Sequence, residues 1–332
     1  MAIVGEDKLS YELENKFSEK IIQNGMLSEA YRRLHYEKIA NNVLWCGTEL
    51  EFKVPISDPA HGKLYRANFC KTRLCPMCSW RRSKKIFGQV SKIMDKIQED
   101  YAFIFITYTV KNCRAEDLSN TIDLLLKAFY KMHDKAKIKK AVKGFFRTVE
   151  VTRHPEYPNE NEYHPHIHAI YAVKKSYFKK DDYIKRQDFA EMWQDAIGAD
   201  YIPFTDVRRI KPEKGNRKKD TIKGAVAEVA KYTVKGSDIL RGDNADIDKA
   251  VYWLHYALTS RRLCAFGGIF KKAAKELKLD DLLDGDLILT DQEEEIRPDV
   301  QFIICRYKWQ VGFGYQLESI EDFHNDDQRS AT

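Results

Sequence analysis

No uninterrupted apolar run in this chain is long enough to cross a membrane, and even the run from Tyr101 to Val110 is short. The segment from Met1 to Lys20 carries charges of both signs and lacks the apolar core of a secretory signal. Cysteine is scarce as well: there are 7 among 332 residues, and an odd number argues against a disulfide framework. These absences predict a soluble, cytoplasmic protein.

A large excess of one charge sign is also missing. The chain has 56 Lys and Arg against 50 Asp and Glu, and its net charge of +6 hints only weakly at an anionic partner. Core-forming residues are plentiful, since 43% of the chain is hydrophobic and there are 18 Tyr and 17 Phe. A chain of this length can form one large domain or two ordinary ones.

Three of the cysteines lie close together. Cys75 and Cys78 have the two-residue spacing that lets two thiolates bind one tetrahedral zinc ion, and Cys70 adds a third ligand. Cys46 is the candidate for the fourth ligand, with His61 as the alternative. A set of unrelated buried cysteines is the competing interpretation, but the spacing favours a closed, structural Zn²⁺ site.

Basic residues cluster in two places. One group opens a predicted helix that runs to Asp100, and the other lies within the stretch from Asp206 to Lys223. Such groups are often only solvated, but their positions beside the other motifs favour contacts with phosphates. The predicted DNA-binding residues are Arg81, Arg82, Lys84, Lys85, Arg208, Arg209, Lys218 and Lys219.

The middle of the chain alternates between strand and helix patterns. Branched and aromatic runs predict strands over 101–110, 144–152 and 163–173, and the turn-rich stretch between the last two makes a hairpin plausible. Apolar residues at helical spacing predict helices over 120–136 and 187–197. A late strand pair is expected over 300–313, followed by a polar tail.

The last of the central strands carries three histidines at alternate positions. Residues i and i+2 of a strand face the same side, so His166 and His168 project together as half of a divalent-metal site. Glu150 is the natural third ligand if its strand pairs with the histidine strand; otherwise it is a half-exposed carboxylate. His164 stands at the strand entrance and is less well placed to reach the metal.

A further motif follows the second basic stretch. If the chain from Thr221 to Gly236 is helical, Glu228 and Tyr232 are neighbours on one face, and Lys235 lies one turn beyond Tyr232. A carboxylate, a phenol and an ammonium group then converge. An ordinary surface helix is the competing interpretation, because these residue types are common there.

These motifs, in this order, resemble those of the initiator proteins of rolling-circle plasmid replication, in the branch with HUH endonuclease domains typical of small Gram-positive plasmids. The stretch 105–110 is similar to the family's first motif, 164–168 to its metal-binding motif, and Glu228 with Tyr232 and Lys235 to its nucleophile motif. The block from Phe69 to Arg82 is similar to an N-terminal feature of the branch. The resemblance covers about residues 45–240.

The resemblance implies an α+β fold with a central five-stranded antiparallel sheet flanked by helices. An N-terminal zinc-binding segment and a C-terminal α/β extension are expected to accompany this sheet. The expected regions are a helical, zinc-binding and DNA-contacting part over 1–98, a nicking and joining catalytic domain over 99–240, and an extension of unknown role over 241–332.

The resemblance also implies an activity. Tyr232 would attack one strand of the plasmid origin, leave a 5′-phosphotyrosine link, and allow rejoining at termination. Mn²⁺ or Mg²⁺ at His166, His168 and Glu150 would assist, Lys235 or the metal would help the phenol to ionise, and Glu228 would activate water at termination. Origin DNA, a host helicase and a host polymerase are the implied partners.

Two other functions fit the same residues. Conjugative relaxases and transposases of the superfamily share the chemistry, but relaxases usually place the tyrosine before the histidine motif, whereas Tyr232 follows it. A non-catalytic zinc-containing DNA-binding protein is the other alternative, although it would not need three convergent polar motifs.

Overall fold

In a computed structural model, the chain divides into two compact units. The first comprises Met1–Arg81 with Asp286–Thr332, and the second comprises Arg82–Gly285. The structure describes residues 12–59, 62–154, 162–179, 182–211, 221–231, 233–288 and 301–323. Each unit contains its own antiparallel sheet, and the two are described separately below.

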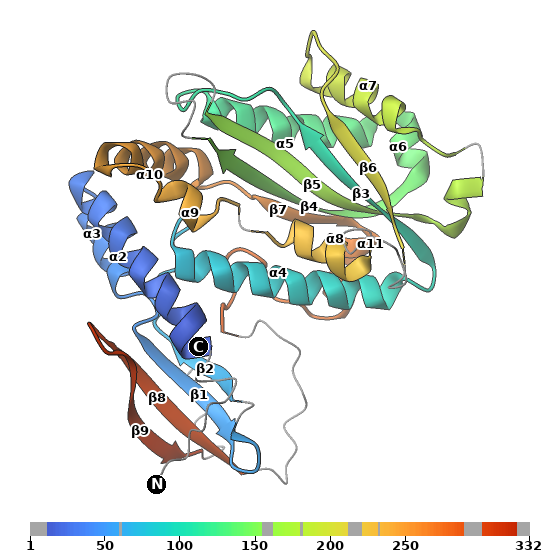
Figure 1. Cartoon of the computed structure of the whole chain (residues 1–332). Helices are drawn as coiled ribbons and strands as arrows, with labels where there is room; N and C mark the ends of the chain where they lie inside the picture. The colour runs from blue at the N-terminus through green and yellow to red at the C-terminus, as the bar shows by residue number, and fades with distance from the viewer. Residues whose placement is uncertain are drawn as a thin grey trace. The chain divides into compact units, whose positions relative to one another are not determined.

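Five antiparallel strands form the sheet of the second unit, in the order β6-β3-β5-β4-β7 (Figure 1). They are β3 (Tyr101–Thr109), β4 (Val142–Arg153), β5 (Tyr163–Lys174), β6 (Thr205–Ile210) and β7 (Cys264–Gly268). The predicted five-stranded antiparallel sheet is therefore confirmed, and so are the three central strands and the hairpin between β4 and β5. The histidine strand β5 occupies the middle of the sheet, where both its faces are covered.

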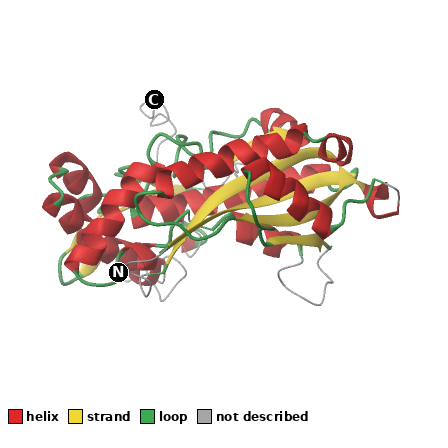
Figure 2. Cartoon of the chain, turned by 90° about the horizontal axis from the view of Figure 1, so that it is seen from above, coloured by secondary structure: helices red, strands yellow, loops and turns green. Residues whose placement is uncertain are grey.

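Helices cover both faces of this sheet, and several lie across its strands in the view from above (Figure 2). On one face, Phe129 of α5 (Leu118–Asp134) and Trp193 of α7 (Arg186–Ile197) pack against Tyr108 of β3. The short α6 (Ala136–Ala141) leads from α5 into β4 on this side. Gly198 ends α7 in the left-handed conformation that glycine adopts without strain.

The opposite face carries the main apolar core. Val90 of α4 (Pro76–Ile97), Val226 of α8 (Ile222–Val229) and Phe270 of α11 (Ile269–Glu276) are buried in one cluster with Phe105 and Ile170 of the sheet. The unit is completed by a 3-10 turn (Lys175–Lys179), α9 (Gly236–Ile239) and α10 (Asn244–Leu258). The core fills only part of this face, so polar side chains can occupy the ends of the strands.

A four-stranded antiparallel sheet, ordered β2-β1-β8-β9, forms the first unit. Its strands are β1 (Glu49–Pro55), β2 (Lys63–Ala67), β8 (Phe302–Gln310) and β9 (Gly314–Asp322). A π-helical turn (Glu12–Phe17), α2 (Ser18–Arg33) and α3 (Glu37–Leu44) precede the sheet. The pairing of β1 with β8 joins segments from opposite ends of the chain.

Two expectations need correction. The helix expected over 221–236 ends at Val229, because the chain leaves helical geometry at Ala230 and resumes only as the short α9. The late strand pair is β8 and β9, so the second strand lies where a polar tail was expected. The fifth strand, β7, comes from beyond the range 99–240. The three functional regions were defined by motifs and stay a prediction.

Candidate active site

The strand register of the second unit brings a carboxylate and two imidazoles together. Glu150 on β4 lies directly opposite His166 on β5, and His168 lies two residues further along β5 on the same face. The Glu150 Oε2 atom is 2.9 Å from His168 Nε2 and 3.5 Å from His166 Nε2. One ligand atom from each residue lies within 4.8 Å of the other two.

The outer nitrogens of both imidazoles are held by other groups. His168 Nδ1 lies 3.0 Å from the Thr107 hydroxyl on the neighbouring strand, and His166 Nδ1 lies 3.1 Å from the His164 carbonyl oxygen. With a metal ion bound, a proton on Nδ1 would satisfy each of these contacts and leave the Nε2 lone pair free to bind the ion. Two neutral imidazoles and a carboxylate form a donor set that suits Mn²⁺ and related divalent ions.

Burial and charge act in opposite directions on this triad. Burial alone raises the pKa of the Glu150 carboxyl, but hydrogen bonds with His166 and His168 outweigh burial and hold that pKa well below its usual range. Burial lowers the pKa of His168, which favours the neutral ring that a metal requires. Among the described residues the grouping excludes His164, whose Nδ1 donates to Asn112 Oδ1 at 2.6 Å.

Glu228 lies near the triad. Its negative charge is one of the contributions that raise the pKa of His168, although burial of the ring outweighs them. The Glu228 side chain is 19% exposed, at the end of α8, and its Oε1 lies 2.5 Å from Lys231 Nζ. The sequence analysis gave no role to Lys231, whose ammonium group lies beside the Glu228 carboxylate.

The nucleophile position, Tyr232, lies outside the described residues. Chain segments immediately before and after it are held close to the triad: Lys231 pairs with Glu228, and the Val151 amide donates to the Thr233 carbonyl at 2.7 Å. Val151 follows Glu150 directly in β4. Lys235 is exposed at the start of α9, and so it does not share the helix of Glu228.

A second donor cluster occurs in the first unit. The Sγ atoms of Cys46 and Cys78 are 3.4 Å apart, those of Cys46 and Cys75 are 3.5 Å apart, and those of Cys70 and Cys78 are 3.7 Å apart. Four thiolates around one zinc ion have sulfur–sulfur separations of about 3.8 Å. The donor set therefore fits zinc. The grouping includes Cys46, while the alternative ligand, His61, lies outside the described residues.

Backbone groups support this cluster. The amide of Cys70 donates to Cys46 Sγ at 3.3 Å, and the amide of Lys71 donates to Cys78 Sγ at 3.2 Å. Lys71 adopts a left-handed backbone, with φ of 58°, which turns its amide towards the sulfur. Hydrogen bonds with the neighbouring thiols lower the pKa of Cys70 well below its usual range, whereas the hydrogen bond with Cys70 raises the pKa of Cys46 and burial raises that of Cys75.

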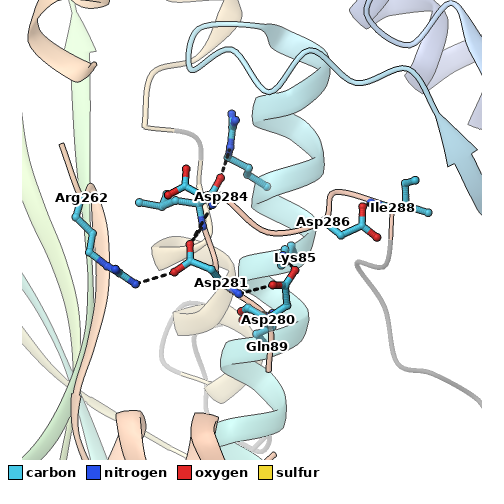
Figure 3. Close-up of polar contacts among 10 residues, drawn as sticks. Lys85, Gln89, Arg262, Asp280, Asp281, Asp284, Asp286 and Ile288 are labelled. Carbon is cyan, nitrogen blue, oxygen red and sulfur yellow. Dashed lines mark hydrogen bonds and ion pairs between the residues drawn. The ribbon is translucent and has the colours of Figure 1, made fainter. Parts of the chain in front are cut away.

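Most of the basic residues predicted to bind DNA on α4 have internal partners. Arg81 donates to the Leu287 and Ile288 carbonyls at 2.9 and 2.7 Å. Lys85 is 2% exposed at its side chain, and its Nζ lies 2.7 Å from Asp280 Oδ2 (Figure 3). Arg82 is also buried, and it donates to the Leu283 carbonyl at 3.4 Å. Phosphate contacts by these three stay a prediction and would require release of these partners. Lys84 is half-buried on the same helix.

The second basic group lies on the edge strand β6. Arg208 pairs with Asp206 at 2.7 Å and packs over the Phe105 ring, and Arg209 is exposed with its guanidinium over the Phe178 ring. Lys218 and Lys219 lie outside the described residues. Arg209 is thus the best placed of the described candidates to meet a phosphate.

The sequence analysis also missed a buried ionic network at the turn end of the histidine hairpin. Arg153 of β4 and Glu162 are 2% and 3% exposed at their side chains and lie 3.2 Å apart. Arg153 donates to the carbonyls of Asp238, Arg241 and Asp246, while Lys249 pairs with Glu162. The network ties the hairpin to α9 and α10. Its partners are far apart in sequence, so no local motif marked it.

Comparison with known proteins identifies the family of this chain. A family model described as replication protein matches residues 61–313. The chain belongs to the Rep family of rolling-circle replication initiators. A "Protein rep" from Bacillus amyloliquefaciens is 36% identical over 329 residues, which cover 92% of this chain and 95% of the relative. A Bacillus sp. "Protein rep" is 40% identical and covers 76% of this chain and 85% of its own length.

A third relative supports the same assignment. The "Protein rep" of Streptococcus pneumoniae serotype 2 is 38% identical over 275 residues, which cover 81% of this chain and 82% of the relative. No solved structure matches the chain. As a Rep-family plasmid replication initiator, the chain acts on origin DNA. In the described part of the chain, no helix is both long and apolar enough to cross a membrane.

Proposed function

We propose that this initiator is a metal-dependent enzyme that nicks and rejoins one strand of the plasmid origin through a covalent tyrosine link. The main support is the triad of Glu150, His166 and His168, whose donor atoms converge on one point. The residue after position 232 is held beside the same strand, because the Thr233 carbonyl accepts from the Val151 amide of β4. We further infer that the five-stranded sheet is an HUH endonuclease fold, with the two histidines of its central strand facing one side.

The triad would hold Mn²⁺ or Mg²⁺, which supplies electrostatic stabilisation for the phosphate oxygen as charge develops on it. Glu150, His166 and His168 hold the ion, and Thr107 keeps the His168 ring in the correct tautomer. Zn²⁺ at the four cysteines has a structural role, because all four of its positions are occupied by thiolates.

Tyr232 is the proposed nucleophile. Its phenolic oxygen attacks the phosphorus, the bond from phosphorus to the 3′ oxygen breaks, and that oxygen takes up a proton. The products are a 5′-phosphotyrosine and a free 3′-hydroxyl, which a host polymerase could extend behind a host helicase. Because the link conserves the energy of the broken bond, attack by a 3′-hydroxyl reverses the step without ATP. Lys235 would favour the ionised phenol.

Glu228 is the proposed general base of termination. At the end of the cycle it would take a proton from water, which then cuts the second time without leaving the enzyme on its product. Its position near His168 supports this role, and its Oε1 atom lies 2.5 Å from Lys231 Nζ. DNA contacts of Arg208, Arg209, Lys218 and Lys219 would hold the backbone across the edge strand.

The deciding experiment detects a covalent adduct. Labelled single-stranded origin DNA, incubated with the full chain and Mn²⁺, should migrate with the protein on a denaturing gel. Tyr232→Phe should abolish this adduct, whereas Tyr252→Phe, at an exposed tyrosine of α10, should leave it unchanged. An adduct that persists at the normal rate in Tyr232→Phe would contradict the assignment of the nucleophile.

A second experiment separates Glu228 from the nucleophile. Glu228→Ala should still form the adduct but should terminate poorly on a template with two origins in tandem. Glu191→Ala, an exposed carboxylate on α7, is the matched control and should terminate normally. Normal termination by Glu228→Ala would exclude the general-base role while leaving the nicking activity intact.

A further inference from the structure

One loop with exposed apolar side chains is hydrogen-bonded to Thr109, the residue that lies opposite His166 in the sheet. The loop connects α7 to β6, and in it the side chains of Ile202 and Phe204 are 61% and 64% exposed, while Pro203 between them is buried. Single exposed apolar residues are common on protein surfaces, but two large ones around a buried anchor form a local patch. Tyr201 precedes them and is half-buried.

The loop is held firmly. The Thr109 hydroxyl donates to the Phe204 carbonyl at 2.7 Å, and the Trp193 indole donates to the Thr109 carbonyl at 2.8 Å. The backbone amide of Lys111 donates to the Tyr201 hydroxyl at 2.9 Å. Exposure of the apolar side chains is thus imposed by a fixed backbone, and the surface is ready before any ligand arrives.

The strand register sets the distance from this patch to the triad. Thr109 at the end of β3 lies opposite His166 on β5, and Thr109 is the residue that binds the Phe204 carbonyl. Neighbouring strands are about 4.8 Å apart, and Phe204 lies on the β6 side of β3, so two strand spacings put its backbone roughly 10 Å from that of His166. A nucleotide whose phosphate sits at the triad would place a neighbouring base within this range.

The charges at this place favour DNA over an apolar protein segment. The exposed Lys111 holds its ammonium group 4.1 Å from the centre of the Tyr201 ring, on the same loop surface as the apolar side chains. A cation beside aromatic rings suits a ligand that combines flat π faces with a negatively charged backbone. A protein partner with a purely apolar surface would leave this ammonium group buried and unpaired.

We propose that Phe204, with Ile202 and Tyr201 beside it, forms a platform on which an unpaired base next to the cleaved phosphate stacks, while Lys111 meets the backbone. This inference rests on the proposed function, because it assumes that single-stranded origin DNA crosses the triad. It adds a binding subsite for a nucleobase.

The test asks whether the Phe204 side chain and one particular base contribute to the same contact. The full chain is titrated with the single-stranded origin oligonucleotide, and with copies in which one nucleotide at a time is abasic, so that the phosphates stay and the base is lost. Phe204→Ala should weaken binding of the intact strand by about 5- to 150-fold, the range for loss of one base–aromatic stack. At one abasic position the wild-type protein should lose the same factor, and Phe204→Ala should lose nothing further.

Two variants serve as controls. Phe204→Trp keeps an aromatic surface and should bind the intact strand as the wild type does. Tyr256→Ala removes an aromatic side chain of similar exposure, 61%, from α10 and should not change the abasic profile. Phe204 is exposed, so its replacement should leave the melting temperature unchanged.

Three outcomes would overturn the platform. In the first, Phe204→Ala binds the intact strand normally. In the second, it weakens the intact strand and all abasic strands equally. In the third, it changes only self-association in sedimentation, which would make the patch a contact between copies of the chain. These titrations measure binding and not cleavage. A wild-type protein that forms no adduct would refute the proposed catalysis, while the binding data would still test the platform separately.

Discussion

The two donor clusters of this chain are assembled in different ways. The thiols of Cys70, Cys75 and Cys78 come from nine residues of chain, of which 70–75 have no helix or strand, and Cys46 joins them from just after α3. The carboxylate of Glu150 and the imidazoles of His166 and His168 come from two strands that pair over their whole length. An ion would organise the first site, whereas the second is organised by the sheet.

The two clusters also differ in whether they leave coordination positions for other ligands. Four thiolates complete a tetrahedral shell, so the cysteine cluster can stabilise a fold but has no position for a substrate. A carboxylate and two imidazoles leave coordination positions for other ligands, as catalysis requires. From this comparison we expect metal removal to affect folding in the first unit and activity in the second.

The largest effect should follow the loss of one thiolate. Cys75→Ser should release the zinc and destabilise the first unit severely, because apparent binding free energies of structural zinc sites are about 10–16 kcal/mol in zinc-finger peptides. Zinc content and thermal unfolding measure the change. Cys305→Ser, at a buried cysteine of the same unit outside the cluster, should retain the zinc. Equal zinc content in both variants would contradict a structural zinc site that depends on Cys75.

The next effect tests whether the histidine hairpin is held by protein contacts instead of by an ion. Arg153→Met should lower the free energy of unfolding of the second unit by about 3–5 kcal/mol, because Glu162 is then left buried without its main partner. Urea unfolding with and without Mn²⁺ measures it. The exposed Arg209→Met is the control and should change stability little. If Arg153→Met lowered the free energy of unfolding only in the presence of Mn²⁺, the hairpin would not be held by protein contacts alone.

A smaller effect should come from the group that orients His168. Thr107→Val removes the hydroxyl beside His168 Nδ1 and should weaken Mn²⁺ binding about 10- to 100-fold, as loss of such outer partners usually does. Isothermal titration measures the affinity. Thr148→Val is matched, because Thr148 lies opposite His168 on the other neighbouring strand. If both variants bind Mn²⁺ equally, the tautomer is set by another group.

The smallest effect contrasts the triad with an imidazole on the other face of the sheet. His133 of α5 is packed against Phe129 and Phe145, and burial lowers its pKa from the ordinary value of 6.5. The folded protein therefore favours the neutral ring, and this contribution to stability is present above pH 6.5 and lost as the pH falls below it. His133→Gln should reduce the loss of stability between pH 7.5 and 5.5 in urea unfolding. An unchanged pH dependence would contradict the assignment.

The parts of the site that could be predicted are those encoded within a few residues. Alternation along β5 indicated that His166 and His168 share a face, and the spacing of Cys75 and Cys78 indicated a thiolate pair. Glu150 could be named because a short turn-rich stretch made a hairpin plausible, and the observed register places it opposite His166.

Other features depended on contacts that no local pattern encodes. Lys85 reads as a basic surface residue, but Asp280, 195 residues away in sequence, pairs with it (Figure 3). Helical spacing suggested one helix over Glu228 and Lys235, but α8 ends at Val229, and Thr233 beyond it accepts a hydrogen bond from Val151 of β4 instead. The partners of Arg153 lie up to 93 residues away, so its role could not be inferred from the sequence alone.

By itself, the amino-acid sequence determined the chemistry of this protein: the donor types, their spacing within each motif, and the strand and helix periods that carry them. Residues close in the chain keep those relations in any compact fold. Only the tertiary structure decided which motifs meet, which cations are buried, and which aromatic side chains stay exposed beside the triad. Those outcomes depend on strand register and on long-range packing, where a contact is chosen by the whole core and not by its neighbours in sequence.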